Sequence, residues 1–253
     1  MHQYLVISPT LKLPLYNIML GIGCIFAFLF LEKQLDNQKC SDKKALLLYL
    51  TLIISGLFGF FGAKMFEMLY KNQALSWHNF IHSGFTFYGG IIMGSIALIF
   101  LSKCFKFKIF SLLNTLTPCV IIAHAWGRIG CFLGGCCFGK MTSSFLGVQY
   151  PENSLPFLFY KESVKIHPVQ LYESAFLFIL FFVINKIQFK NRFCAYLIIY
   201  GIIRFLLEFL RGDFRGTLLG NTFSPSQIIS LLCISLGLGL YYFYQNKNIS
   251  IGI

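Results

Sequence analysis

Glycines, cysteines and one arginine interrupt an otherwise apolar sequence between His124 and Lys140. Arg128 can present five hydrogen-bond donors in a fixed plane to a phosphate, and a glycine lets a lipid or a neighbouring helix approach the main chain closely. The segment therefore predicts an anion site at the end of a hydrophobic helix. An alternative of equal weight is that Arg128 extends to lipid headgroups while the glycines only pack helices. The glycines are Gly127, Gly130, Gly134, Gly135 and Gly139.

Three of the nine cysteines, Cys131, Cys136 and Cys137, lie in the same stretch. Their spacing is not a standard zinc pattern, and a bridge between neighbouring cysteines would be strained. We therefore expect no metal site and no cofactor, and we keep a redox role for these thiols only as an alternative.

Charged residues inside two apolar segments form further candidate groups. Arg204, Glu208 and Arg211 share one face of a predicted helix, so the Glu208 carboxylate can hold either arginine. An arginine inside a membrane span is a candidate functional residue by default. In the other segment, we expect Lys64 and Glu67 to pair on one helix face.

The elements that position these residues are membrane spans. The chain has 253 residues, of which 57% are hydrophobic and 12% charged, and its mean hydropathy is +0.70. Soluble domains carry about 25% charged residues, so the composition predicts an integral membrane protein. The net charge of +12 is concentrated between apolar segments, where loop orientation and anionic lipid explain it. With no basic patch on a soluble face, nucleic-acid binding is excluded.

Seven transmembrane helices are expected, giving an all-α polytopic protein that forms one domain over residues 1–253. Basic residues cluster in three loops and in the C-terminal tail, and lysines and arginines favour the cytoplasmic side. This alternation puts the N-terminus outside and the C-terminus inside. The long segment 127–166, rich in aromatic residues, is expected to form a small extracytoplasmic cap. The expected spans are about 14–31, 45–70, 87–102, 109–126, 167–185, 193–210 and 223–244.

This topology collects unusual polar residues near the outer ends of the helices. Their number exceeds what is needed for side chains that only reach toward headgroups. An arginine pair with a carboxylate, lined by glycine-rich helices, suits a substrate with a phosphate head and apolar tails. These residues are Tyr88, Arg128, His167, Gln170, Glu173, Arg204, Glu208, Arg211 and Gln227.

Three linked motifs resemble the prolipoprotein diacylglyceryl transferase family. They are Gly127-Arg128-Ile129-Gly130-Cys131-Phe132 with Gly135 and Gly139, His167-Pro168-x-Gln170-Leu171-Tyr172-Glu173, and Tyr200-Gly201-x-x-Arg204-x-x-x-Glu208-x-x-Arg211. Their order, their spacing and their positions relative to the spans agree with the family, and the resemblance extends from Tyr16 to Gln227.

The resemblance implies a bacterial inner-membrane enzyme with its active site toward the outer leaflet. It would transfer the diacylglyceryl group of phosphatidylglycerol to the lipobox cysteine of a preprolipoprotein, forming a thioether and releasing glycerol phosphate. Arg128 and Arg204 are expected to stabilise negative charge on the leaving phosphate. The other expected catalytic residues are Tyr88, Glu208 and His167. Expected substrate-binding residues are Tyr16, Lys64, Gly89, Gly90, Gly127, Gly130, Gly139, Gln170, Tyr172, Glu173, Arg211 and Gln227.

The sequence departs from the family pattern at several positions. Tyr88 stands where many members have a histidine, and an unperturbed phenol with a pKa of about 10 is a poor base for a thiol. Lys64 follows Ala63 where a Gly-Arg pair is usual, which keeps the charge but not the bidentate geometry. Cys131 and Cys136 replace an asparagine and an acidic residue. The alternatives are therefore a related membrane enzyme with another acceptor or lipid donor, and a non-enzymatic lipid-binding or redox protein.

Overall fold

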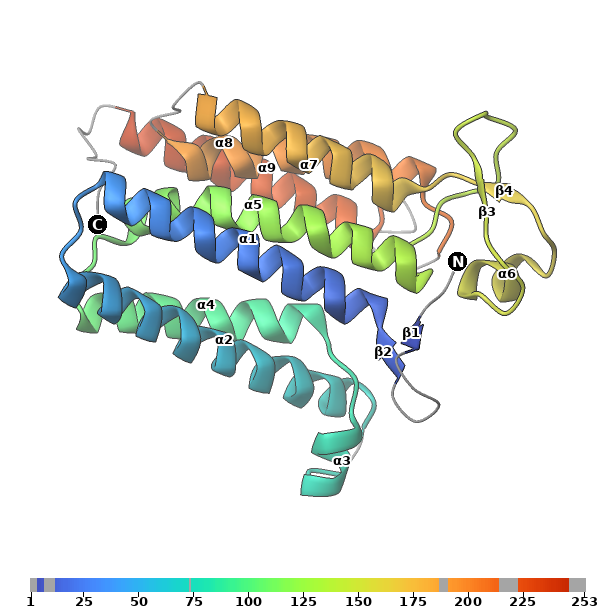
Figure 1. Cartoon of the computed structure of the whole chain (residues 1–253), viewed down its shortest axis with the longest axis horizontal. Coiled ribbons are helices and arrows are strands. Elements are labelled where there is room, and N and C mark those ends of the chain that lie inside the picture. Colours follow the sequence, from blue (N-terminus) through green and yellow to red (C-terminus); the bar gives the residue numbers. More distant parts are fainter. Residues whose placement is uncertain (1–3, 7–11, 73, 187–190, 214–222, 246–253) are drawn as a thin grey trace. The chain divides into compact units, whose positions relative to one another are not determined.

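The computed structural model describes residues 4–6, 12–72, 74–186, 191–213 and 223–245 (Figure 1). The chain divides into two compact units. Of the described residues, the first unit contains those up to Lys33 and those from Asn114 onward, and the second contains those from Gln34 to Leu113.

Two long helices that pack through glycines form the second unit. They are α2 (Asp42–Tyr70) and α4 (Phe87–Cys104), with the short α3 (Trp77–His82) between them in sequence (Figure 1). A side chain at Gly59 would meet the Gly90 carbonyl oxygen at 3.2 Å, and one at Gly89 would meet the Gly62 carbonyl oxygen. Small residues are needed at this interface because the two backbones approach so closely.

The first unit is a helical bundle that also contains two small sheets, one before Leu15 and one between Gly134 and Val169 in the chain. Its helices are α1 (Leu15–Asn37), α5 (Ile109–Gly134), α7 (Val169–Lys186), α8 (Arg192–Leu207), the 3-10 turn η1 (Glu208–Leu210) and α9 (Pro225–Tyr244). Strands β1 (Tyr4–Val6) and β2 (Lys12–Pro14) pair antiparallel, with Leu5 opposite Leu13. Gly201 lets α8 lie against α9, since a side chain there would meet the Ser230 carbonyl oxygen at 3.0 Å.

The segment between α5 and α7 folds around an aromatic core of its own. We call residues 135–166 the cap segment; it contains β3 (Val148–Gln149), α6 (Leu155–Tyr160) and β4 (Lys165–Ile166), with β3 and β4 antiparallel. Phe138, Tyr150 and Ile166 form its buried core. Removing these side chains from water is the main source of stability for so short a segment.

Backbone hydrogen bonds tie the cap segment to the ends of two bundle helices. Lys140 donates its N–H to the Leu210 carbonyl at 2.8 Å, and Gly212 donates to the Phe138 carbonyl at 3.0 Å. Gly139 donates to the His167 carbonyl at 3.0 Å. Three stretches that are far apart in sequence therefore meet in one small ladder beside η1 and the start of α7.

The prediction of a mostly helical polytopic membrane protein is confirmed. Within the described residues, six helices are long and apolar enough to cross a membrane, and Tyr88–Cys104 is a shorter apolar helix. Two details differ from expectation. The fold includes two small antiparallel sheets and is therefore not purely helical. Helix α5 continues to Gly134 rather than ending near Trp126, because Gly127 and Gly130 do not interrupt its hydrogen bonding.

Candidate active site

The carboxylate of Glu173, on α7, is the centre of a buried polar group. Its side chain is 3% exposed, and Oε1 lies 2.9 Å from Nη2 of Arg128, on α5. The Tyr200 hydroxyl, on α8, donates to the same oxygen at 2.7 Å. The Nε2 atom of His124 lies 3.7 Å from it. Three helices therefore contribute to one group in which the charges of Arg128 and Glu173 neutralise each other.

Aromatic contacts fix the side chains around Glu173. The rings of Tyr196 and Tyr200 stack with centroids 5.4 Å apart, and His124 packs edge-on against Tyr200. Nδ1 of His124 lies 3.3 Å from the Tyr196 hydroxyl. With Nε2 facing Glu173 and Nδ1 facing Tyr196, both ring nitrogens of His124 point at polar partners.

A second group joins the end of α8 to the start of α9. Nη2 of Arg204 lies 2.7 Å from Oε2 of Glu208 and donates to the Ser226 hydroxyl at 3.0 Å. Nη1 of Arg211 lies 3.7 Å from the same Glu208 oxygen. The prediction that Glu208 can hold either arginine is therefore confirmed.

Arg211 also has a partner that the sequence reasoning did not identify. Its Nε and Nη2 atoms donate to the two carboxylate oxygens of Asp213 at 2.6 and 2.8 Å, a bidentate pair. Burial alone would lower the pKa of Arg211, but the hydrogen bonds to Asp213 raise it above its usual range. Arg211 therefore stays charged, with much of its donor capacity used within the protein.

Arg128 and Arg204 both retain donors for a ligand. Nε of Arg128 and Nη1 of Arg204 are buried and have no hydrogen-bond partner among the residues that the structure describes. Arg204 also interacts electrostatically with Glu173 and His124, so the two groups share one electrostatic environment. A buried unpaired guanidinium nitrogen is costly, and an incoming anion would satisfy it.

Several predicted substrate-binding residues have structural partners. Gln227 forms a capping box with Ser224 at the start of α9. Gln170 donates from Nε2 to the Cys136 carbonyl at 2.6 Å, and the Tyr172 hydroxyl lies 3.2 Å from Nδ1 of His167. These contacts give each of these polar side chains a partner within the protein, and their roles in substrate binding stay predictions.

The predicted glycines have three different environments. A side chain at Gly130 would meet the Tyr16 backbone oxygen at 3.1 Å, so this glycine lets α1 contact α5. Gly139 lies so close to His167 that a side chain would collide with the carbonyl oxygen. At Gly127 nothing in the described structure lies within 4 Å of the same position. Of these three glycines, only Gly127 has open space where a side chain would begin. It directly precedes Arg128 in the sequence.

The predicted pairing of Lys64 with Glu67 in the second unit is wrong. Nζ of Lys64 donates to the carbonyl oxygens of Phe80, Ile81 and Ser83 at 2.9, 2.9 and 3.0 Å. Glu67 instead pairs with Lys71 at 2.7 Å and accepts the Thr86 hydroxyl at 2.5 Å. An ammonium has three donors, and Lys64 uses all of them to hold the end of α3.

The other predicted site residues of the second unit lie at the start of α4. Tyr88 is exposed there, whereas Gly89 and Gly90 lie in the contact with α2. The two glycines therefore have a packing role within this unit.

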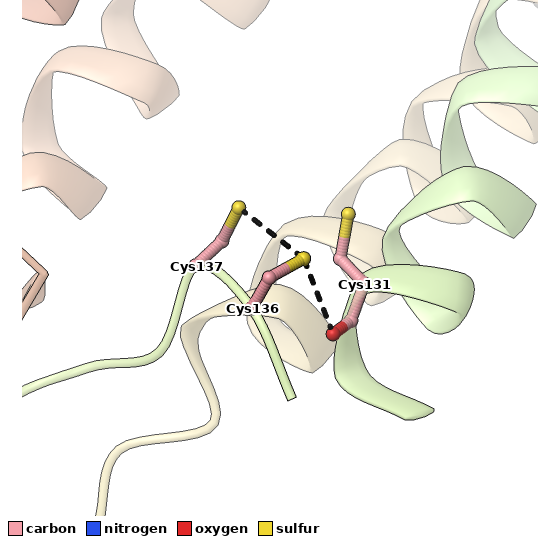
Figure 2. A group of neighbouring side chains, drawn as sticks. All are labelled: Cys131, Cys136 and Cys137. Atoms are coloured by element: carbon pink, nitrogen blue, oxygen red, sulfur yellow. Dashed lines mark hydrogen bonds between the residues drawn. The ribbon is translucent and has the colours of Figure 1, made fainter. Parts of the chain in front are cut away.

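The three clustered cysteines are brought together in space. Their sulfur atoms all lie within 4.8 Å of one another, at the end of α5 and in the residues that follow it (Figure 2). Hydrogen bonding to Cys131 and Cys137, together with burial, raises the pKa of the Cys136 thiol. The spacing of these cysteines in the sequence does not reveal that they converge.

A family model for prolipoprotein diacylglyceryl transferase matches residues 3–243. The chain belongs to this family. Phosphatidylglycerol–prolipoprotein diacylglyceryl transferase of Clostridium tetani is 32% identical over 239 residues, covering 91% of this chain and 93% of the relative. The second enzyme of that name in Clostridium perfringens is 32% identical over 247 residues, covering 94% of this chain and 93% of the relative. The enzyme of the Wolbachia of Culex pipiens is 30% identical over 242 residues, covering 89% and 88%.

Four polar side chains along α8 and the start of η1 are candidates for the function of this family. Tyr196, Tyr200, Arg204 and Glu208 recur every four residues and so lie on one helix face. Sequence analysis singled out Arg204 and Glu208 but not the hydrogen-bonding role of the tyrosines. The four-residue repeat in an apolar helix was the signal that could have found them.

Proposed function

We propose that this protein transfers the diacylglyceryl group of phosphatidylglycerol to the lipobox cysteine thiol of preprolipoproteins. The proposal rests on two buried ion pairs, Arg128–Glu173 and Arg204–Glu208. They occur in a chain that the family model matches over nearly its whole length. In each pair a carboxylate holds a guanidinium in place while one guanidinium nitrogen stays free of partners in the described structure. Such a site suits a phosphate.

The reaction forms one bond and breaks one. The acceptor sulfur attacks the glyceryl carbon that carries the phosphate, and the carbon–oxygen bond breaks with its electron pair going to the phosphate oxygen. Negative charge therefore grows on the leaving glycerol phosphate. We assign its stabilisation to Arg128 and Arg204, whose free nitrogens are positioned before substrate arrives.

Glu173 and Glu208 are assigned as positioning residues. Each carboxylate restricts its arginine to one orientation, and it neutralises the positive charge while phosphate is absent. Tyr200 holds Glu173, and Ser226 receives a hydrogen bond from Arg204, so both arginines have further supports. For the thiol proton, Tyr88 and His167 are the candidate acceptors that we retain.

For substrate binding we retain Tyr16 and Gly127, from the first unit. The Tyr16 side chain is exposed at the start of α1, and Gly127 leaves room on α5. Both features suit entry of a lipid from the bilayer, since a lipid needs an accessible face and close approach to the main chain.

We further propose that the two units act as one transmembrane transferase domain with α4 as a seventh span. Basic residues between the apolar segments support an external N-terminus and a cytoplasmic C-terminus. The cap segment and the two arginine groups would then face the outside of a bacterial inner membrane, next to the outer leaflet.

Mass spectrometry of a lipobox peptide, incubated with the purified protein and phosphatidylglycerol, tests the proposal. The expected result is a diacylglyceryl mass gain on the cysteine that Arg204→Ala lowers by roughly 100- to 1,000-fold. Arg192→Ala is the matched control, because Arg192 lies on the same helix about 18 Å away. If wild-type protein binds phosphatidylglycerol but never modifies the peptide, the proposed function is wrong.

A further inference from the structure

The end of α5 brings two cysteines together through a specific backbone motif. The N–H of Gly135 bonds to the Phe132 carbonyl at 3.1 Å, and the N–H of Cys136 bonds to the Cys131 carbonyl at 3.1 Å. Gly135 has a φ of 72°, in the left-handed region. This is a Schellman motif, in which the side chains at the first and last positions of the paired segment meet. Here both of those side chains are thiols.

The third cysteine joins them through an unusual backbone conformation. Cys137 has a φ of 61°, which a residue other than glycine adopts rarely and at a cost. Successive side chains of an extended strand point to opposite sides, but this turn directs the Cys137 sulfur back to within 3.8 Å of the Cys136 sulfur. Figure 2 shows all three sulfur atoms pointing to the same side of the chain.

The sulfur separations match those in a metal–thiolate site. A zinc–sulfur bond is about 2.3 Å, so two sulfur ligands at a tetrahedral angle lie about 3.8 Å apart. The Cys136–Cys137 separation is 3.8 Å, and the third sulfur lies within 4.8 Å of both. The other two separations therefore exceed the tetrahedral value by at most about 1 Å.

Positively charged side chains interact with the cluster. Arg128 interacts electrostatically with Cys131 and Cys137, and Arg211 interacts with Cys137. Three thiolates around a divalent cation would leave one net negative charge, and these arginines offset it.

We propose that Cys131, Cys136 and Cys137 bind one thiophilic metal ion of the zinc class, with the fourth coordination position open to an outside ligand. Soft thiolate ligands select such ions, and three protein ligands with one open position is an established arrangement for zinc. The bound ion would lock the end of α5, which carries Arg128, onto the start of the cap segment. The site stands independently of the transferase reaction.

The test uses full-length protein purified in detergent and made metal-free with a chelator under reducing conditions. Elemental analysis after zinc addition and desalting should give about one ion per chain. Cobalt(II) should produce a thiolate-to-metal charge-transfer band, which zinc should then remove by competition. Each single replacement, Cys131→Ser, Cys136→Ser or Cys137→Ser, should weaken zinc binding at least about tenfold.

Cys24→Ser is the matched control, because Cys24 is an exposed thiol on α1 outside the cluster. It should bind zinc and cobalt as the wild type does. The proposal is overturned by sub-stoichiometric zinc in reduced wild-type protein, or by cobalt binding without a thiolate band. Unchanged binding in the cysteine variants, or a native disulfide within the cluster, would also overturn it. The wild-type cobalt titration decides the question even if a variant fails to fold.

Discussion

Replacing Glu173 with glutamine should strongly lower the free energy of unfolding of the protein. The carboxylate lies 2.9 Å from Arg128, and Coulomb attraction at that distance is about 6 kcal/mol with an effective dielectric constant of about 20. Much of this offsets the cost of burying both charges. Removing one partner, however, leaves the other buried and uncompensated, which costs about 3–5 kcal/mol.

Thermal unfolding in detergent measures this loss. A change of about 3–5 kcal/mol corresponds to a fall in Tm of roughly 6–20 °C in a domain of this size. Glu162→Gln is the matched control, since Glu162 is exposed in the cap segment and its loss should change the free energy of unfolding by less than about 0.5 kcal/mol.

A double-mutant cycle then isolates the ion pair. Arg128→Gln and Glu173→Gln should each be strongly destabilising, while the double variant should be less destabilised than the sum of the two by about 1–3 kcal/mol. Transferase activity should fall in both single variants, since each one disorders the proposed phosphate site. Additive losses, or a Glu173→Gln protein as stable as the Glu162→Gln control, would refute the central role of this ion pair.

Three further changes test other parts of the structure. Gly139→Ala should destabilise the protein by about 1–3 kcal/mol because the added side chain would collide with a neighbouring carbonyl. Gly127→Ala should leave the free energy of unfolding unchanged or raise it by about 0.5–1 kcal/mol. Melting curves of the two variants test the difference. Lys64→Met should lower the free energy of unfolding by about 3 kcal/mol, because it removes three hydrogen bonds to carbonyls. Lys71→Met breaks an exposed ion pair and should lower it by less than about 1 kcal/mol. Equal losses of stability in the two variants would contradict the structure. Burial raises the pKa of Tyr150 to about 12, so its neutral form adds stability that is complete below pH 10 and is lost as the pH rises through 12. The difference in Tm between wild type and Tyr150→Phe should therefore change across this range, and a constant difference would argue against the shift.

The polar face of α8 could be predicted because it depends only on helical spacing. Arg204 and Glu208 lie four residues apart, so helical spacing alone brings them together. Arg211 follows η1 in an extended conformation, and its contact with Glu208 also depends on that turn. The capping box of Ser224 and Gln227 is equally local, since a serine followed three residues later by glutamine is its known signature. The predicted role of Gln227 in substrate binding stays a prediction, and the capping box is a further role that the sequence pattern could have shown.

Contacts between distant residues could not be predicted in the same way. Lys64 binds carbonyls that lie 16–19 residues later in the chain, so its partners depend on how the chain turns through α3. The nearer Glu67 was favoured only because helical spacing was the available rule. Glu173 likewise meets Arg128 only after α5 and α7 have packed.

The cysteine cluster depends on two backbone angles that residue spacing does not reveal. Gly135 is a recognisable helix-ending residue, but the left-handed conformation of Cys137 is unusual for a side chain of its type. Predicting the cluster required both, which explains why the spacing of the thiols alone suggested no site.

The order of synthesis determines when the hydrogen bonds between the cap segment and the bundle can form. They join residues around Gly139, His167 and Gly212, so the last hydrogen bonds cannot form until the chain beyond η1 has left the ribosome. Bacterial synthesis adds about 5–20 residues per second, so several seconds separate synthesis of the cap segment from synthesis of its partners Leu210 and Gly212. Pausing of translation between α7 and η1 would lengthen that interval, and protease sensitivity of the nascent cap segment should rise accordingly.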